Sequence, residues 1–224
     1  MDGFALPVKK LKGTDPVEML DLLRASIGVA SAVVIASLIG DNGALTSVDV
    51  GWNDINGNVA QELATVVLSK PTLEDFCNIP IKKLRADSLS ELDLSGNGVG
   101  VPGALVLANL LPVTGGLTSI DLSRNQLCGI WTDWEGDQHG TYTAEGITLI
   151  ADALRVNGAL TSVDLGGNKL GDEGWGAIFA AICGNKDSKI MCLDASSENI
   201  SPAGVKLIAE ALRTSVTGAL MKVR

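Results

Sequence analysis

The residues that could carry chemistry fall into two sets, acidic residues at a repeated position and aromatic residues in one segment. The acidic set comprises one carboxylate per copy of an apolar pattern: Asp21, Asp49, Asp93, Asp121, Asp164 and Asp194. The second set lies within residues 129–143: Trp131, Asp133, Trp134, His139 and Tyr142. His139 is the only histidine, and no G-x-S-x-G, H-E-x-x-H or phosphate-loop lysine motif occurs. We therefore expect no enzyme, no cofactor and no metal site.

A glycine-rich segment has the spacing of a dinucleotide-binding motif. Gly98, Gly100 and Gly103 form G-x-G-x-x-G between a predicted strand and a predicted helix, and Asp121 follows eighteen residues later. The equivalent turn at residues 171–174 shares the backbone role without these glycines. We therefore expect the glycines to shape a turn and not to bind a nucleotide.

Charge and composition narrow the possible partners and compartments. The 224-residue chain has a net charge of −9, which disfavours binding to nucleic-acid phosphates. A basic protein partner is compatible with this charge, and so is the simpler alternative that acidity keeps the chain soluble. The spacing of the four cysteines predicts buried, reduced thiols and an intracellular, cytoplasmic location: Cys77, Cys128, Cys183 and Cys192.

An uncharged segment at residues 25–40 could be read as a membrane span or as a buried helix. It is shorter than the roughly 18 residues that a span requires, and an acid-containing leader precedes it. It also has an internal counterpart, because residues 6–12 parallel 79–85, and residues 20–38 parallel 92–110 after one inserted residue. We therefore expect a buried helix and no membrane span.

The chain repeats the pattern L-x-x-L-x-L-x-x-N-x-L, with small substitutions. Its copies begin 28 or 30 residues apart where the repeat is regular, and segments with helical spacing, such as 144–154 and 203–212, lie between them. In the copy that begins at Ile190, Glu198 replaces the asparagine. We predict a strand, a turn and a helix per repeat, with parallel strands at residues 17–22, 45–50, 73–78, 89–94, 117–122, 160–165, 190–195 and from 220.

This pattern closely resembles the leucine-rich-repeat family, specifically its ribonuclease-inhibitor-like subclass. The resemblance spans nearly the whole chain and implies one α/β domain, residues 1–224, with about 7–8 repeats. It implies a right-handed solenoid with parallel strands on the concave face and helices on the convex face. The repeated asparagines are expected to bond backbone groups at the turns: Asn53, Asn97, Asn125 and Asn168.

Three places break the repeat. Residues 73–88 form a short unit that we expect to return by an extended or irregular path, because it is too short for a helix. Residues 129–143 form an insertion. The chain stops at residues 220–224, inside what reads as an opening strand, so either it is a fragment or a partner contacts the uncapped C-terminal edge.

Two candidate surfaces follow for a protein partner. The repeated aspartates are expected on the concave face, where they would repel one another and have raised pKa values, with Trp52 at the rim. The alternative is that each carboxylate is held by an adjacent serine: Ser47, Ser119 or Ser162. The second candidate is the insertion, whose side chains could form a contact site or could fold back onto the repeats: Trp131, Asp133, Trp134 and Tyr142.

We therefore predict a non-catalytic protein–protein interaction module, such as an accessory subunit of a larger assembly. Two alternatives stay open. One is a regulator of a small GTPase, because one activator family shares this repeat subclass. The other is an inhibitor of a basic enzyme, because the ribonuclease inhibitor has this architecture. Neither alternative has a matching residue beyond the repeat pattern itself.

Overall fold

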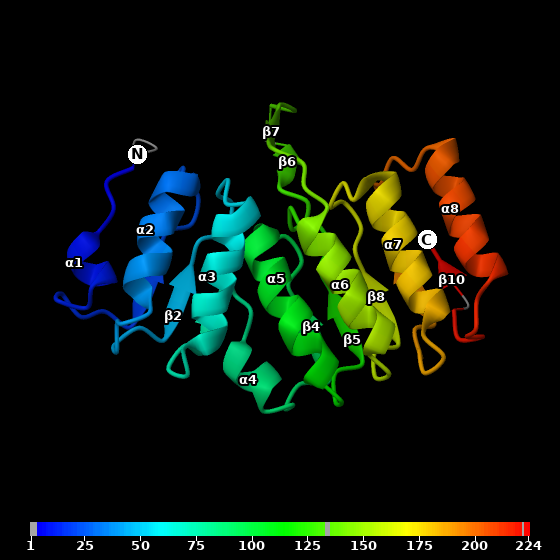
Figure 1. Cartoon of the computed structure of the whole chain (residues 1–224), viewed down its shortest axis with the longest axis horizontal. Helices are drawn as coiled ribbons and strands as arrows, with labels where there is room; N and C mark the ends of the chain where they lie inside the picture. The colour runs from blue at the N-terminus through cyan, green and yellow to red at the C-terminus, as the bar shows by residue number, and fades with distance from the viewer. Residues whose placement is uncertain (1–3, 133–134, 221) are drawn as a thin grey trace.

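The structure is a computed structural model that describes residues 4–132, 135–220 and 222–224, and it is built from repeated strands, turns and helices (Figure 1). The repeat strands are β1 (Met19–Asp21), β2 (Ser47–Asp49), β3 (Asp75–Phe76), β4 (Glu91–Asp93), β5 (Ser119–Asp121), β8 (Ser162–Asp164), β9 (Cys192–Asp194) and β10 (Lys222–Val223). The helices are α1 (Val8–Leu11), α2 (Val29–Ile39), α3 (Gly57–Ser69), α4 (Ile81–Arg85), α5 (Gly100–Leu110), the 3-10 turn η1 (Leu111–Val113), α6 (Glu145–Val156), α7 (Gly171–Gly184) and α8 (Pro202–Arg213).

The strands form two parallel sheets. One sheet has the order β1-β2-β3 and the other the order β4-β5-β8-β9-β10, so neighbours in sequence are neighbours in space. The longer helices lie side by side in a layer that covers the sheets (Figure 1). This is a leucine-rich-repeat type of arrangement, whereas the right-handed, concave form of the solenoid and the number of its repeats stay predictions. The strands lie within the predicted ranges but are only two or three residues long.

The core lies between the strand layer and the helix layer. Pattern residues such as Val48, Ile120 and Val163 point inward from the middle of their strands and are almost fully buried. From the helices, residues spaced three or four apart meet them, for example Ile147, Ile150 and Leu154 in α6. Each repeat therefore buries its apolar side chains against its neighbours as well as within itself.

A ladder of buried amides holds the turns that follow the strands. The Asn168 side-chain amide donates to the carbonyls of Leu122 and Leu165, and its Oδ1 accepts from the N–H of Asn125. Asn53 and Asn125 make the same kinds of bond one or more repeats earlier. At Glu198 a carboxylate takes over the accepting role, bonding the N–H groups of Lys169 and Leu170 at 2.7 and 2.8 Å. The predicted bonds are thus confirmed at Asn53, Asn125 and Asn168, where they satisfy backbone groups that the turns leave unpaired, and the role of Asn97 stays a prediction.

The short unit interrupts the sheet, and our expectation that it contains no helix is wrong. One helical turn, α4, follows Pro80, because five residues suffice for a single turn where a full return helix does not fit. After β3 the chain doubles back at once, with Phe76 and Ile79 forming an isolated bridge. We call the side of the molecule where the turns follow the strands the turn edge. There the repeats on either side of the short unit are in direct contact, since the N–H of Trp52 donates to the carbonyl of Gly98 at 3.3 Å.

The predicted internal similarity at the N-terminus is visible in the backbone. Pro7 before α1 and Pro80 before α4 have nearly the same dihedral angles, φ −77° and ψ 67° against φ −78° and ψ 75°. The uncharged segment forms α2, the counterpart of α5. Within the described residues, no helix has both the length and the apolar character needed to cross a membrane.

Candidate protein-binding surfaces

The repeated aspartates stand in register along the strand face, the side of the sheets opposite the helices. Asp21 pairs with Asp49 in the first sheet. In the second sheet Asp121 lies between Asp93 and Asp164, and Asp164 lies beside Asp194. The row is interrupted between Asp49 and Asp93, where β3 and β4 belong to different sheets.

These carboxylates are engaged by the turns that follow them. In each case one oxygen accepts the backbone N–H two residues downstream, for example Asp121 from Ser123 at 2.8 Å and Asp164 from Gly166 at 2.9 Å. The same bond occurs at the other four: Asp21, Asp49, Asp93 and Asp194. The expectation that the preceding serines hold the carboxylates is therefore wrong. A side chain so short reaches its own turn more easily than a neighbouring side chain.

The row is not a uniform set of repelling carboxylates. Burial raises the pKa of Asp49 and of Asp164, with a smaller contribution from the neighbouring aspartates. Hydrogen bonds from Ser95 lower the pKa of Asp93, and those from Ser196 lower the pKa of Asp194. The prediction of raised values throughout is thus wrong, because local bonds to the ionised form outweigh repulsion at exposed positions.

The prediction that all four cysteines are buried is wrong for one of them. Cys77, Cys128 and Cys183 are buried free thiols, whereas Cys192 is exposed in β9. Cys192 occupies the same register position as Ser162 and Ser119, whose side chains point to the strand face. No cluster of three or more candidate metal ligands occurs among the residues that the structure describes.

The insertion forms an antiparallel hairpin, β6 (Ile130–Thr132) and β7 (Gln138–Gly140), which projects beyond the turn edge (Figure 1). Trp131 and His139 are a cross-strand pair whose rings stack 4.6 Å apart, at an interplanar angle of 29°. Trp131 also meets the Trp52 ring edge to face, with centroids 6.0 Å apart and planes at 81°. The hairpin therefore connects the two separately predicted aromatic positions.

Trp52 is fixed from both sides by the repeats. The guanidinium of Arg24 lies over its ring, 5.0 Å from the centroid. On another side Gly98 is so close that a methyl group there would lie 2.2 Å from Trp52 Cδ1. Arg24 was missed by sequence reasoning, although the signal exists. It precedes Trp52 by 28 positions and has the same left-handed backbone, φ 51° against 55°.

These side chains line an open pocket of about 750 Å³ between the hairpin and the turn edge. The hairpin contributes Trp131, Thr132, His139 and Gly140. The turns after β1 and β2 contribute the opposite wall: Arg24, Ser26, Ile27, Gly28, Trp52, Asn53 and Asp54. We call this the aromatic pocket. Its combination of half-buried indole rings and polar groups on a projecting element is typical of protein contact sites.

Tyr142, another predicted residue of the insertion, does not line the aromatic pocket. Tyr142 donates from its hydroxyl to the carbonyl of Leu170 at 2.8 Å, and burial raises the pKa of this phenol to about 12. Lys169 Nζ bonds Thr132 Oγ1, which ties the hairpin to the next repeat. Asp133 and Trp134 fall outside the described residues.

The three glycines of the nucleotide-like motif have structural roles. Gly98 makes room for Trp52, as described above. Gly100, with φ 63°, donates to the carbonyl of Asn125. Gly103 lies against Val99 and Ile79, where a methyl group would be 2.4 Å from Val99 Cγ1. Each glycine is thus required for a close approach or a left-handed turn.

The C-terminal edge has a short strand and a partly uncovered helix. β10 pairs with β9, and Arg224 lies 3.7 Å from Asp194. In α8, Val205 and Leu212 are 55% and 46% exposed, although the equivalent residues of α7, Trp175 and Ile182, are fully buried. This surface is apolar where an interior repeat would be covered.

Comparison with known families agrees with this architecture. A family model described as the Leucine Rich repeat matches residues 87–108 and 159–179. These ranges contain β4 with most of α5, and β8 with the part of α7 up to Phe179. A comparison with curated proteins found no match. The two matched segments, together with the parallel strands and covering helices, support a leucine-rich-repeat protein.

Proposed function

We propose that this chain is a non-catalytic protein-interaction module that binds its partner at the aromatic pocket. Leucine-rich repeats generally mediate protein–protein interaction. The observation that carries the proposal is the contact of Trp52 with Trp131, which joins a turn of an early repeat to the inserted hairpin. Neither indole belongs to the repeat pattern, and large aromatic residues supply much of the binding energy at protein interfaces.

The repeated aspartates are a weaker candidate for the contact surface. Their carboxylates already accept backbone N–H groups, so a partner would meet oxygens with fewer free lone pairs. A basic partner would still be attracted by the net charge of −9. The aspartates therefore favour the approach of a partner more than its specific binding. A role as an accessory subunit of a larger assembly in the cytoplasm is compatible with attraction by the aspartates and specific binding at the aromatic pocket.

Site-specific photo-crosslinking in an extract of the source cells tests the proposal. A photoreactive amino acid at Thr132 lies in the aromatic pocket, and one at Ser119 lies on the strand face. We expect the Thr132 probe to label a discrete protein, and Trp131→Ala to abolish this labelling. Tyr142→Phe is the matched control and should leave it intact, because Tyr142 is outside the aromatic pocket.

Labelling from Ser119 alone, or labelling from Thr132 that survives Trp131→Ala, would contradict the proposal. The salt dependence of partner binding also distinguishes the aromatic pocket from the strand face. Binding through the aromatic pocket should weaken only slightly between low and high salt, whereas binding through the aspartates should weaken steeply.

A further inference from the structure

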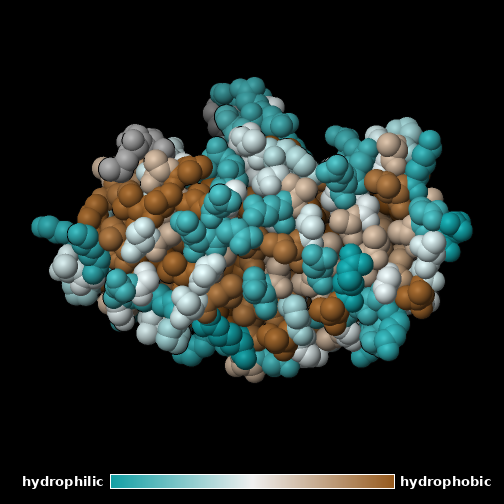
Figure 2. Space-filling model, in the orientation of Figure 1, coloured by the Kyte–Doolittle hydropathy of each residue, from teal (hydrophilic) through white to brown (hydrophobic). Residues whose placement is uncertain are grey.

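The inserted hairpin is a polar element that stands apart from the repeats. β6 and β7 form a two-stranded sheet of their own, and no backbone hydrogen bond joins them to the other described residues. β7 is exposed along its whole length, and polar surface covers the projecting part of the hairpin on the side seen in Figure 2. The hairpin therefore loses little if it moves further into solvent.

Each leg of the hairpin contains a glycine near the base. The base itself is held by the N–H of Thr143, which donates to the carbonyl of Cys128 at 3.0 Å. Beyond this bond, Gly129 in one leg and Gly140 in the other have left-handed backbones, with φ 75° and 81°. Because glycine has no side chain to restrict its dihedral angles, small rotations at these two residues reorient the hairpin as a unit.

Side chains hold the hairpin to the turn edge on both sides of one repeat. On one side Trp131 meets Trp52, which lies against Gly98. On the other side Lys169 bonds the last residue of β6. Gly98 and Lys169 directly follow the pattern asparagines of their repeats, and Gln126 holds this position in the repeat between them, because β5 lies between β4 and β8. Gln126 therefore lies at the foot of the hairpin, between its two side-chain contacts.

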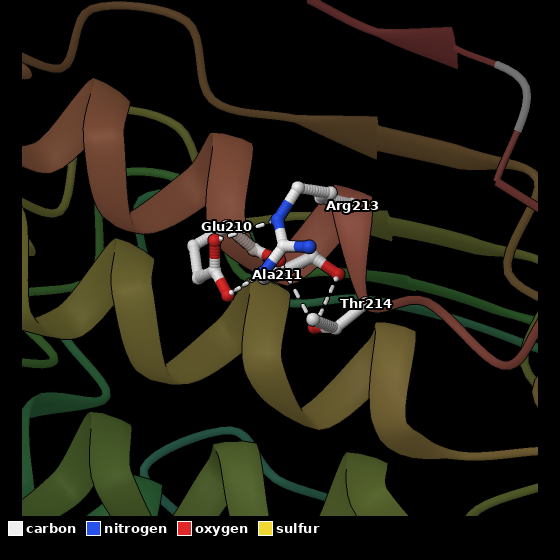
Figure 3. A network of polar contacts seen from close by, with 4 residues as sticks. All are labelled: Glu210, Ala211, Arg213 and Thr214. Carbon is white, nitrogen blue, oxygen red and sulfur yellow. Dashed lines mark hydrogen bonds and ion pairs between the residues drawn. The ribbon is translucent and has the colours of Figure 1, made fainter.

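The Gln126 side chain is buried at this place without a hydrogen-bond partner. It is 4% exposed, and neither Nε2 nor Oε1 bonds any group among the described residues. The equivalent side chain is exposed at Asp54. By contrast, charged groups of α8 are paired although they are exposed, since Arg213 donates to both carboxylate oxygens of Glu210, at 2.9 and 2.6 Å (Figure 3). Burying an unpaired amide costs free energy that contact with water recovers.

Two opposing effects therefore act on the hairpin. Its contact with the turn edge gains the packing of Trp131 on Trp52 and the bond to Lys169. The unpaired Gln126 amide at its foot opposes this contact. A buried unpaired amide and an aromatic contact differ in sign but are similar in magnitude. Two positions of the hairpin are therefore close in free energy.

We propose that the hairpin is a hinged lid with a docked and a lifted position, and that Gln126 favours the lifted one. In the docked position Trp131 meets Trp52 and the aromatic pocket is complete. In the lifted position the two rings separate and water reaches the Gln126 amide. A partner that binds the complete aromatic pocket selects the docked position. This consequence rests on the proposed function, whereas the two positions of the hairpin do not.

Fluorine NMR of the chain labelled with fluorotryptophan tests the proposal, because it observes each indole separately. Single replacements by phenylalanine assign the resonances. We expect relaxation dispersion, which reports exchange between two positions, at Trp131 and Trp52. Trp175 should show none, because it is fully buried in α7. Trp175 thus distinguishes movement of the lid from unfolding of the repeats.

Two variants should shift the balance in opposite directions. Gln126→Met keeps the length of the side chain and removes its polar atoms, so the lifted population should fall about tenfold. Lys169→Met removes the bond to Thr132 and should raise the lifted population about threefold. Gln61→Met is the control, because it makes the same replacement at an exposed residue of α3 and should leave the populations unchanged.

A wild type without exchange at Trp131 would overturn the proposal, and so would exchange of equal size at Trp175. An unchanged or larger lifted population in Gln126→Met would overturn it too. Circular dichroism checks the fold of each variant, and if Gln126→Met does not fold, an unchanged population in Lys169→Met has the same meaning.

Failure of the proposed function is a separate outcome. Two positions of the hairpin, without crosslinking from Thr132 that depends on Trp131, would contradict the binding role and support the lid. Such crosslinking by a hairpin with a single position would support the binding role and overturn the lid.

Discussion

The strand face and the aromatic pocket differ in how the repeat produces them. The strand face arises from the regular part of the repeat, so each aspartate has the same place and the same bond to its own turn. The aromatic pocket is formed by three repeats, which contribute Arg24, Trp52 and an inserted hairpin. Repetition here satisfies the backbone, and the exceptions leave side chains available to a partner.

The largest effect should come from closing the space beside Trp52. Gly98→Ala combines a left-handed φ of 68° with a methyl group 2.2 Å from the indole. We expect a loss of about 3 kcal/mol in the free energy of unfolding, from backbone strain and overpacking together. Gly96→Ala is the matched control, with φ 64° and open space around it, and should cost about 1 kcal/mol.

Urea denaturation followed by tryptophan fluorescence measures both variants. If Gly98→Ala and Gly96→Ala lower the free energy of unfolding by the same amount, then Trp52 is not held against Gly98. The Trp52 side of the aromatic pocket would then not be fixed by the repeats.

A smaller effect is expected from removing one ring of the aromatic pocket. Trp131→Ala deletes both the stack on His139 and the contact with Trp52, which together stabilise the docked hairpin by about 1 to 2 kcal/mol. Amide hydrogen exchange in β7 should accelerate, while exchange in β8 stays unchanged. Trp131→Phe keeps an aromatic ring and should retain most of the protection. Equal exchange in β7 for the wild type and Trp131→Ala would show that the hairpin is not docked through this ring.

Removing the hydroxyl of Tyr142, which bonds the Leu170 carbonyl, should have an effect of similar or smaller size. Tyr142→Phe removes the bond to the Leu170 carbonyl and should cost about 1 kcal/mol. The phenol has its pKa raised to about 12 in the folded chain, above the ordinary value of 10. The unfolded chain therefore loses this proton first, so stability should fall as the pH rises above 10. Ultraviolet titration of the phenol measures its pKa in the folded protein, and a midpoint near 10 would contradict the prediction.

The smallest effects should come from the strand face, and they should have opposite signs. Asp164 has a raised pKa, so its ionised form costs stability at pH 7, and this cost disappears as the pH falls through the folded pKa. Asp194 has a lowered pKa, so its ionised form adds stability at pH 7, which is lost as the pH falls.

Asp164→Asn should therefore stabilise the protein at pH 7 and Asp194→Asn should destabilise it, each by less than about 1 kcal/mol because solvent screens these groups. Both differences should shrink by pH 3. Thermal unfolding at the two pH values measures them. Equal signs for the two variants would indicate that the row behaves as one set of mutually repelling charges.

The sequence predicts the regular elements well because each depends on spacing. The strands of the Leu117 and Leu160 copies and the helix α6 between them follow from apolar residues at fixed intervals. The helical turn α4 was missed, because a unit of this length leaves room for one turn but shows no helical period.

The candidate site was only half predictable. Trp52 and Trp131 are unusual at their positions and were singled out separately, but their contact depends on the path of the hairpin, which no repeat spacing encodes. Arg24 could have been found, since it is one repeat length before Trp52 and so must lie beside it. The bonds that hold the aspartates depend on the turn conformation, which the pattern of leucines does not specify.

Hydrogen–deuterium exchange of the chain alone and bound to the protein identified by crosslinking tests the central claim most directly. We predict that the partner protects residues 24–28, 52–54, 130–132 and 138–140, the segments that contain the lining of the aromatic pocket, and leaves residues 119–121 and 162–164 unchanged. Protection confined to those two strands, with none around Trp52 and Trp131, would contradict the claim that the exceptions to the repeat form the binding site.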